Sequence, residues 1–329
     1  MSTPPTSPTA TIHPANYGLN LYLLDTRPWP RTFLSPPSHP SHPSSLLPLL
    51  PHRERIEVLR FRQPADQLLA LGSRLLRRWA VVRSGVCGWR EAHFGVGNGG
   101  AGGVGSGLGE GRRGGKPVLL AGEGEGVEEE REGFGFNVSH SAGLVVCVSG
   151  RGPEGMRVRV GVDIEKIDRA EEEFLKPGGL TAFLEEFEGV FSERELRSSW
   201  ASYREDGDLV PRREEVRMVI RGAYMLWTVH EAYGKMLGVG LLEADGAGRI
   251  ELDRVVSLPP DGETLRLDGR SRAFVAEHQD MTIFTSVLEG EYMMTCSFLD
   301  FEEYSVSDMP PLQIVTLGSL LLHAKPFDS

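Results

Sequence analysis

The chain has 329 residues, of which 40% are apolar and 25% charged, and its formal net charge is −11. This composition is typical of a globular protein with one large core or two medium cores, and the acidic balance argues against general nucleic-acid binding. No apolar run approaches the roughly 20 residues that span a bilayer, and the first residues lack the basic start and apolar segment of a secretory signal. We therefore expect a cytoplasmic protein without membrane or nucleic-acid partners. Its three cysteines have no metal-ligand spacing and are expected to be reduced thiols.

The N-terminal third predicts a disordered tail, one strand and two helices. Residues 1–18 are rich in Pro, Ser and Thr, which favours disorder. Residues 19–25 (LNLYLLD) predict a strand. The apolar spacing over 53–84 is helical, and Pro64 divides it into two helices because proline cannot donate a hydrogen bond to the preceding turn.

Residues 95–115 are more than half glycine, which predicts a flexible insertion. A phosphate-binding loop is the alternative, but such a loop needs a strand before it and a helix after it, and neither is indicated. An acidic loop follows at 123–132, and the short segment GKPVLL (115–120) lies between the two.

Residues 134–149 predict a strand, a polar turn and a second apolar strand. The turn would contain Asn137, Ser139, His140 and Ser141. Such residues often bond only their own backbone in turns. The functional alternative is that Ser139 and His140 bind a phosphate, His140 through a charge-assisted hydrogen bond.

Residues 157–165 (RVRVGVDIE) alternate between apolar and polar positions without a break, which predicts a strand with one buried face. Asp163 and Glu165 then project from the polar face, roughly 6–7 Å apart along the strand. Gly161 on the same face is expected to leave room for a ligand. The pair is either part of an ordinary solvated sheet face or half of a divalent-cation site.

Helices are predicted over 170–200, where Ser192 and Glu195 have the spacing of a capping box, and over Val216 to Leu237. In the second helix, Glu231 and Lys235 are four residues apart and share a face. They form either an ion pair on a solvated face or a third acid with a phosphate-binding lysine beside it. Gly238 and Gly240 are expected to end this helix.

Short strands are predicted again between about 250 and 298, and 301–329 is expected to be an irregular tail in which LGSLLL (317–322) can pack locally. The order of strands and helices predicts an α+β protein with two similar halves. We place the N-terminal half at 19–160 and the C-terminal half at 161–300. Combined, the acids, histidine, serine and lysines suit phosphoryl transfer, which needs a Mg²⁺ held by oxygens, cations around phosphates and a base.

Five motifs, in this order along the chain, resemble the 4′-phosphopantetheinyl transferase superfamily in its large form, typified by the surfactin-synthetase activator: GKP (115–117), FNVSHS (136–141), GVDIE (161–165), FSERE (191–195) and WTVHEAYGKMLGVG (227–240). The resemblance spans about residues 19–300. The stretch from 59 to 76 is most similar to fungal members.

The resemblance implies two α+β halves related by a pseudo-twofold, with the active site in the cleft between them. It implies transfer of 4′-phosphopantetheine from coenzyme A to a serine of an apo carrier protein, with release of 3′,5′-ADP. The expected targets are acyl and peptidyl carrier domains of fatty-acid, polyketide and nonribosomal peptide synthesis, together with the aminoadipate reductase of lysine biosynthesis. We expect the enzyme to be a monomer.

The same resemblance implies roles for individual residues. Asp163, Glu165 and Glu231 would be Mg²⁺ ligands, with Asp163, Glu231 and Lys235 in the catalytic set. Glu231 would also assist deprotonation of the carrier serine. The residues implied in binding coenzyme A are Arg60, Lys116, Ser139, His140 and Lys235.

The chain departs from the family pattern at two places. His230 stands where the family has lysine, and Gln67 and Leu68 stand where basic residues are expected after Asp66. These changes leave open a degenerate homologue that binds coenzyme A or a carrier protein without catalysis. A metal phosphohydrolase is a weaker alternative, because neither a second metal cluster nor a water-activating histidine set is visible.

Overall fold

The computed structural model describes the residues 10–12, 18–34, 45–96, 116–122, 131, 133–152, 158–168, 171–176, 178–187, 190–191, 195, 212–238, 250–252, 263–271, 279–299, 304–306 and 308–327. No helix within these ranges is both long enough and apolar enough to cross a membrane.

The first sheet has four strands in the order β13 (Leu312–Val315), β2 (Asn20–Asp25), β6 (Leu144–Arg151) and β5 (Phe134–Ser141). β13 is parallel to β2, and the other pairs are antiparallel. A two-residue turn at Ala142 and Gly143, with φ of 43° and 93°, joins β5 to β6. The predicted polar turn at 137–141 is therefore wrong, because those residues belong to β5 and the tight turn follows them.

The second sheet has five antiparallel strands in the order β7 (Val160–Lys166), β11 (Tyr292–Leu299), β10 (Gln279–Leu288), β9 (Thr264–Ser271) and β8 (Ile250–Leu252). Two short pairs accompany the sheets. β3 (Phe94–Val96) is antiparallel to β4 (Pro117–Leu119), and β1 (Ala10–Ile12) is parallel to β12 (Tyr304–Val306).

The two sheets pack against each other through one apolar core. Leu21, Leu23 and Val146 from the first sheet meet Val162 and Ile164 of β7 in a single buried cluster. This confirms that the apolar positions of RVRVGVDIE share a buried face. The burial of these side chains is what fixes the register of β7, since a one-residue slip would turn them outward.

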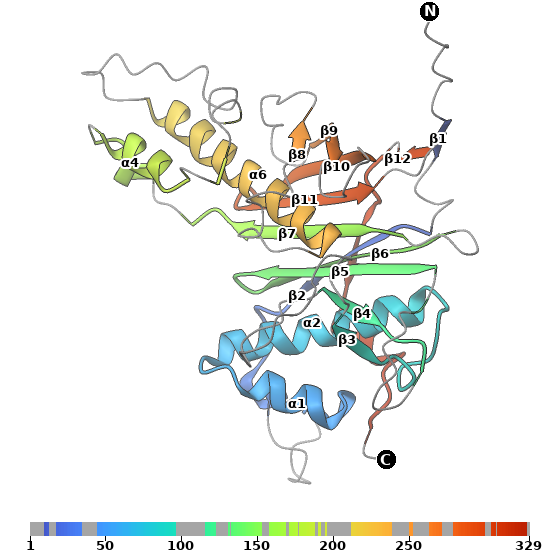
Figure 1. The fold of residues 1–329 in the computed structure, drawn as a ribbon. Coiled ribbons are helices and arrows are strands. Elements are labelled where there is room, and N and C mark those ends of the chain that lie inside the picture. The colour runs from blue at the N-terminus through green and yellow to red at the C-terminus, as the bar shows by residue number, and fades with distance from the viewer. Residues whose placement is uncertain are drawn as a thin grey trace, which may run out of the picture.

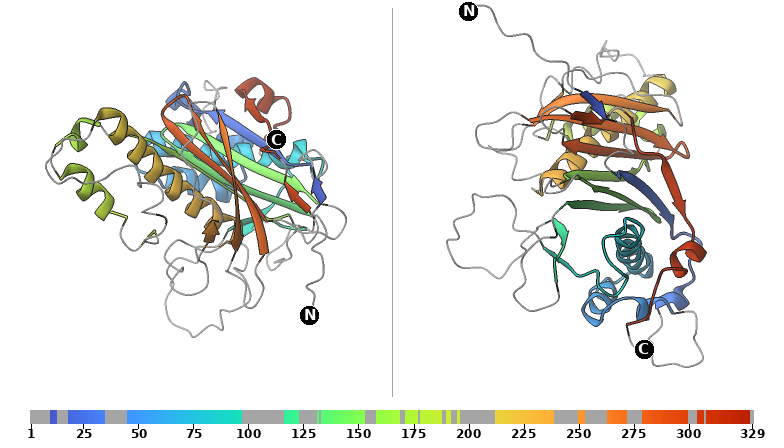
Figure 2. Two further views of the ribbon diagram at one scale, coloured as in Figure 1. Left: turned by 90° about the horizontal axis from the view of Figure 1, so that it is seen from above. Right: turned by 90° about the vertical axis from the view of Figure 1, so that its right-hand side faces the viewer.

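A long helix covers the outer face of each sheet (Figures 1 and 2). Helix α2 (Pro64–Arg83) packs on the first sheet, and α6 (Arg213–Leu237) packs on the second. The α+β class is confirmed by this arrangement, whereas a pseudo-twofold between two similar halves stays a prediction. α6 ends at Gly238, whose φ of 82° is the left-handed conformation that glycine adopts readily, as predicted.

The shorter helices are α1 (His52–Leu59), α3 (Glu171–Phe174), α4 (Gly179–Glu185) and α7 (Leu317–Leu321), with 3₁₀ turns η2 (Arg31–Leu34) and η3 (Leu47–Leu49). The predicted division of 53–84 at Pro64 is confirmed by α1 and α2. Phe174 of α3 and Phe183 of α4 pack on the N-terminal part of α6.

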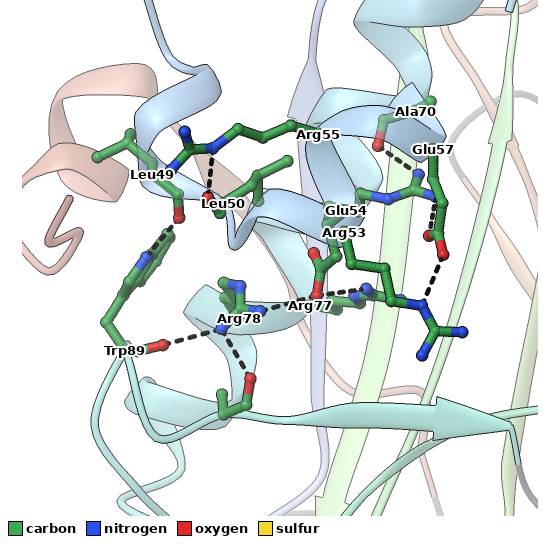
Figure 3. A network of polar contacts seen from close by, with 12 residues as sticks. Leu49, Leu50, Arg53, Glu54, Arg55, Glu57, Ala70, Arg77, Arg78 and Trp89 are labelled. Carbon is green, nitrogen blue, oxygen red and sulfur yellow. Dashed lines mark hydrogen bonds and ion pairs between the residues drawn. The ribbon is translucent and has the colours of Figure 1, made fainter. Parts of the chain in front are cut away.

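Buried arginines connect α1 to α2 and to the loop after α2. The Arg78 guanidinium donates to Glu54 at 2.7 Å and to the carbonyl oxygens of Trp89 and Ala92 at 2.9 and 2.7 Å (Figure 3). Arg77 pairs with the same Glu54 carboxylate at 3.0 Å. Because a buried charge is costly without partners, these contacts hold the two helices and the loop in one arrangement.

Three segments differ from expectation at their edges. The predicted irregular tail over 301–329 is wrong for β13, which extends the first sheet, whereas the local packing expected for LGSLLL is confirmed by the fully buried Leu320 of α7. β1 lies within the predicted disordered tail 1–18, and β3 includes the start of the predicted insertion 95–115. The other residues of these segments and of the acidic loop lie outside the described residues, namely 1–9, 13–17, 97–115, 123–130, 132, 301–303, 307 and 328–329. Ser192 of the predicted capping box and Gly240 of the predicted helix end also lie outside them.

Candidate active site between two sheet edges and helix α6

The polar face of β7 lies against α6 instead of facing solvent. Asp163 is only 2% exposed. A Cβ on Gly161 would lie 1.9 Å from the carbonyl oxygen of Ala232 and 2.7 Å from the hydroxyl of Ser297. The expectation that Gly161 leaves room for a ligand is therefore wrong, because the helix backbone fills that space. The glycine instead brings the carboxylate of Asp163 close to the side chains of α6.

Polar side chains of β5 bond the edge of β7. Asn137 Oδ1 accepts from the backbone N–H of Val162 at 3.1 Å, and Ser139 Oγ donates to Asp163 Oδ1 at 2.7 Å. Ser141 Oγ donates to Glu165 Oε2 at 2.9 Å. β5 is an edge strand of the first sheet and β7 is an edge strand of the second. Side-chain hydrogen bonds join these two edges in place of a backbone ladder. They also fix the orientation of both carboxylates.

Lys235 of α6 completes this cluster. Its Nζ lies 2.5 Å from Asp163 Oδ1, 3.0 Å from Ser139 Oγ and 3.9 Å from Glu231 Oε2. The predicted i,i+4 pair of Glu231 and Lys235 is present, but the shorter contact of the ammonium is with Asp163. We call Ser139, Asp163, Glu165, Glu231 and Lys235 the acid–lysine cluster.

The carboxylates of the acid–lysine cluster repel one another. Burial, followed by the charge of Asp163, raises the pKa of Glu165, and the charge of Glu231 adds to the shift. Burial also raises the pKa of Glu231, where the nearby Lys235 opposes the shift and Asp163 increases it. Three acids and one lysine leave an excess of negative charge that a bound cation would offset.

The cluster fits a magnesium ion that is held partly by substrate. Asp163 Oδ2 is buried and has no hydrogen-bond partner among the described residues, so it can accept a bond from a ligand. Within the described residues, no three His, Cys, Asp or Glu side chains converge as a complete set of metal ligands. Mg²⁺ commonly binds through one or two carboxylates together with substrate phosphates and water, so a complete protein cage is not required.

His140 lies beside the cluster but on the other face of β5 from Ser139, since successive strand residues alternate. It is exposed at the end of β5. Desolvation and then the charge of Lys235 lower its pKa, while Asp163 and Asp66 act in the opposite direction. Asp66 belongs to the first turn of α2, so this helix begins near the site.

Lys116 and Arg60 lie outside the acid–lysine cluster. Lys116 Nζ donates to the carbonyl oxygen of Val160 at 2.8 Å and to that of Met236 at 3.4 Å, which links β7 to the end of α6. Arg60 is exposed after α1, where it lines an open hollow of about 290 Å³ with Glu57, Phe61 and Arg74. Among contacts of the described residues, none joins Arg60 to the acids.

His230 has an acidic partner that the sequence did not reveal. Its Nε2 lies 3.0 Å from Oε1 of the buried Glu195, and its ring lies 5.3 Å from that of Phe191. The FSERE motif therefore supports the residue next to Glu231. The capping-box spacing of FSERE singles out Glu195 as a residue of interest, but that spacing carries no information about a contact with a residue 35 positions away.

The comparisons with known proteins agree with the motifs. The family description "4′-phosphopantetheinyl transferase superfamily" matches residues 159–296, which include Asp163, Glu165, Glu231 and Lys235. The chain is 30% identical over 305 residues to "4′-phosphopantetheinyl transferase 1" of Fusarium mangiferae, covering 91% of this chain and 93% of that protein. It is 31% identical over 186 residues to a "4′-phosphopantetheinyl transferase" of Aureobasidium melanogenum, covering 54% and 47%.

Proposed function

Because the chain belongs to the 4′-phosphopantetheinyl transferase superfamily and is a transferase, we propose that it loads carrier proteins from coenzyme A. It transfers 4′-phosphopantetheine to the serine hydroxyl of an apo carrier domain and releases 3′,5′-ADP. The observation that supports this best is the acid–lysine cluster, in which a buried, partly unpartnered Asp163 lies between a serine and a lysine.

In the proposed reaction, the carrier serine oxygen attacks the β-phosphorus of coenzyme A. The new bond joins that oxygen to phosphorus, and the bond from phosphorus to the oxygen of 3′,5′-ADP breaks. Glu231 accepts the serine proton, directly or through a water molecule. The Glu231 carboxylate is partly buried beside Lys235, and a carboxylate held in position in this way can act as a general base.

Asp163, Glu165 and Glu231 would hold Mg²⁺, which when bound supplies positive charge that neutralises the pyrophosphate. Ser139 and Ser141 hold the first two of these acids in place. Lys235 contacts the phosphate oxygens, so Asp163, Glu231 and Lys235 form the catalytic set.

On the coenzyme A side, we assign the nucleotide to Ser139, His140, Lys116 and Arg60. His140 is exposed and near Lys235, where it can reach a phosphate. Its lowered pKa means that a charge-assisted bond requires proton uptake when the phosphate arrives. Lys116 would have to exchange a carbonyl oxygen for a phosphate oxygen.

The carriers are acyl and peptidyl carrier domains of fatty-acid, polyketide and nonribosomal peptide synthesis, and the aminoadipate reductase of lysine biosynthesis. The enzyme acts as a monomer in the cytoplasm, with halves at 19–160 and 161–300 forming the cleft. The paired sheets, each with its own long helix, are consistent with two halves.

The test is loading of an apo carrier protein with coenzyme A and Mg²⁺, followed by mass spectrometry. A mass gain of one phosphopantetheine on the carrier serine is expected. Asp163→Asn should lower turnover by about 100-fold or more, as removal of groups that stabilise transition-state charge does. Asp168→Asn, an exposed position on the segment after β7, is the matched control and should retain turnover.

Two results would contradict the proposal. No loading across several carriers, despite binding of coenzyme A, would support the alternative of a binding protein without catalysis. Near-normal turnover of a correctly folded Asp163→Asn or Asp163→Ala variant would refute the role of that residue.

A further inference from the structure

Lys235 contacts the oxygens that a divalent cation would take. Its ammonium lies 2.5 Å from Asp163 Oδ1 and 3.9 Å from Glu231 Oε2, and these two carboxylates are proposed ligands. The Asp163 side chain is 3% exposed, whereas that of Lys235 is 31% exposed. The lysine therefore reaches a buried acid from a position that is still open to solvent.

We propose that Lys235 is an exchangeable counter-ion of Asp163, which a divalent cation displaces and which then turns to the substrate phosphates. This inference rests on the proposed function, because it uses the same site. It adds that the lysine has two alternative partners, and that cation binding selects between them.

The hydrogen bonding of Asp163 supports the exchange. Oδ1 already accepts from Ser139 Oγ and from Lys235 Nζ, whereas Oδ2 is buried and has no partner in the part of the chain that the structure describes. A cation bound to this carboxylate and to Glu231 would lie a few ångströms from the ammonium. At such a separation like charges repel strongly where water is largely excluded.

The lysine side chain can make the move without rearrangement of the fold. Four carbons separate its ammonium from α6, and its end is partly in solvent. Ser139 can continue to donate to Asp163 after the ammonium leaves, so the carboxylate keeps its orientation. Cation and phosphate binding are then positively coupled, because each favours the same position of Lys235.

The test measures Mn²⁺ binding by electron paramagnetic resonance, without coenzyme A or carrier protein. Lys235→Met, which keeps most of the unbranched side chain but removes the charge, should bind Mn²⁺ about tenfold more tightly than wild type. Lys166→Met is the matched control. It removes the same charge three residues from Asp163, where the Lys166 ammonium lies 3.8 Å from the exposed Glu291, and should leave the affinity within about twofold.

Thermal denaturation gives a second readout. Mg²⁺ should raise the melting temperature of Lys235→Met more than that of wild type, because Asp163 in the variant has no ammonium partner that the cation must displace. Equal Mn²⁺ affinities in the two proteins, weaker binding by Lys235→Met, or no detectable binding by it would overturn the exchange.

A further variant separates this inference from the proposed function. If Asp163→Asn binds Mn²⁺ as tightly as wild type, the assigned metal site itself is wrong. If Asp163→Asn loses the ion while Lys235→Met does not gain affinity, the metal site stands and the exchange of Lys235 is refuted.

Discussion

Replacing Gly161 with alanine should separate β7 from α6 and thereby disturb both stability and chemistry. The added methyl carbon would lie 1.9 Å from the carbonyl oxygen of Ala232 and 2.8 Å from the backbone nitrogen of Met236. A normal carbon–oxygen contact is about 3.5 Å, so the helix backbone must retreat by about 1.5 Å. The neighbouring atoms are backbone, which cannot rotate away as a flexible side chain can.

Overpacking of this kind lowers the free energy of unfolding by about 1–3 kcal/mol. Alanine also restricts the unfolded chain more than glycine does, and this entropic effect offsets only part of the loss. A net loss of about 2 kcal/mol corresponds to a melting temperature lower by roughly 3 °C in a chain of 329 residues. Carrier loading should also fall, because Glu231 and Lys235 move away from Asp163 together with the helix. Gly122→Ala is the matched control, since no atom of the described residues, apart from its chain neighbours, lies within 4 Å of its added carbon.

The assay is chemical and thermal denaturation of both variants, together with carrier loading at a temperature where both are folded. If Gly161→Ala is as stable and as active as Gly122→Ala, the close approach of helix and strand does not hold the site. A variant that is destabilised but turns over normally would show that the catalytic groups tolerate the shift of α6.

Three further predictions test the tail and two titrating groups. Leu320→Ala should destabilise the protein by about 2–4 kcal/mol in urea denaturation, whereas Leu321→Ala, which is 43% exposed, should change stability by about 0.5 kcal/mol or less; equal effects would refute the packing of the tail. The native state raises the pKa of Glu231 above 4.5 and so binds its proton more tightly than the unfolded state, which lowers stability as pH rises through the raised pKa. Glu231→Gln should therefore gain melting temperature relative to wild type as pH rises from about 4 to 8, and a constant difference would contradict this. The lowered pKa of His140 keeps it neutral near pH 7, so coenzyme A binding should be accompanied by proton uptake in the wild type but not in His140→Ala. Calorimetry in buffers of different ionisation enthalpy measures this difference.

The sequence predicted well which residues share a face. The period of two in RVRVGVDIE placed Asp163 and Glu165 together, and the i,i+4 spacing placed Glu231 with Lys235, as the structure confirms. Pro64 was sufficient to divide the first helical segment. These features depend on local geometry, which a sequence pattern records directly.

Sequence periodicity does not predict which helix or strand packs on a given face. Gly161 was expected beside a ligand, and only the packing of α6 shows why a side chain is excluded there. Asn137, Ser139 and Ser141 alternate with the same period as the β7 acids, but their pairing joins strands of different sheets. Glu195 and His230 likewise meet through tertiary packing, for which spacing provides no signal.

The parallel pairing of β13 with β2 has a consequence for how the chain folds during synthesis. β2 ends at residue 25 and β13 begins at residue 312, so the first sheet can be completed at this edge only after residues 312–315 have been synthesised. A fragment that stops after residue 160 would present β2 as an open edge, which invites association with other strands. The first sheet with α2 is therefore contiguous in space but not in sequence, and any division of this protein for expression should keep residues 308–327 with the N-terminal part.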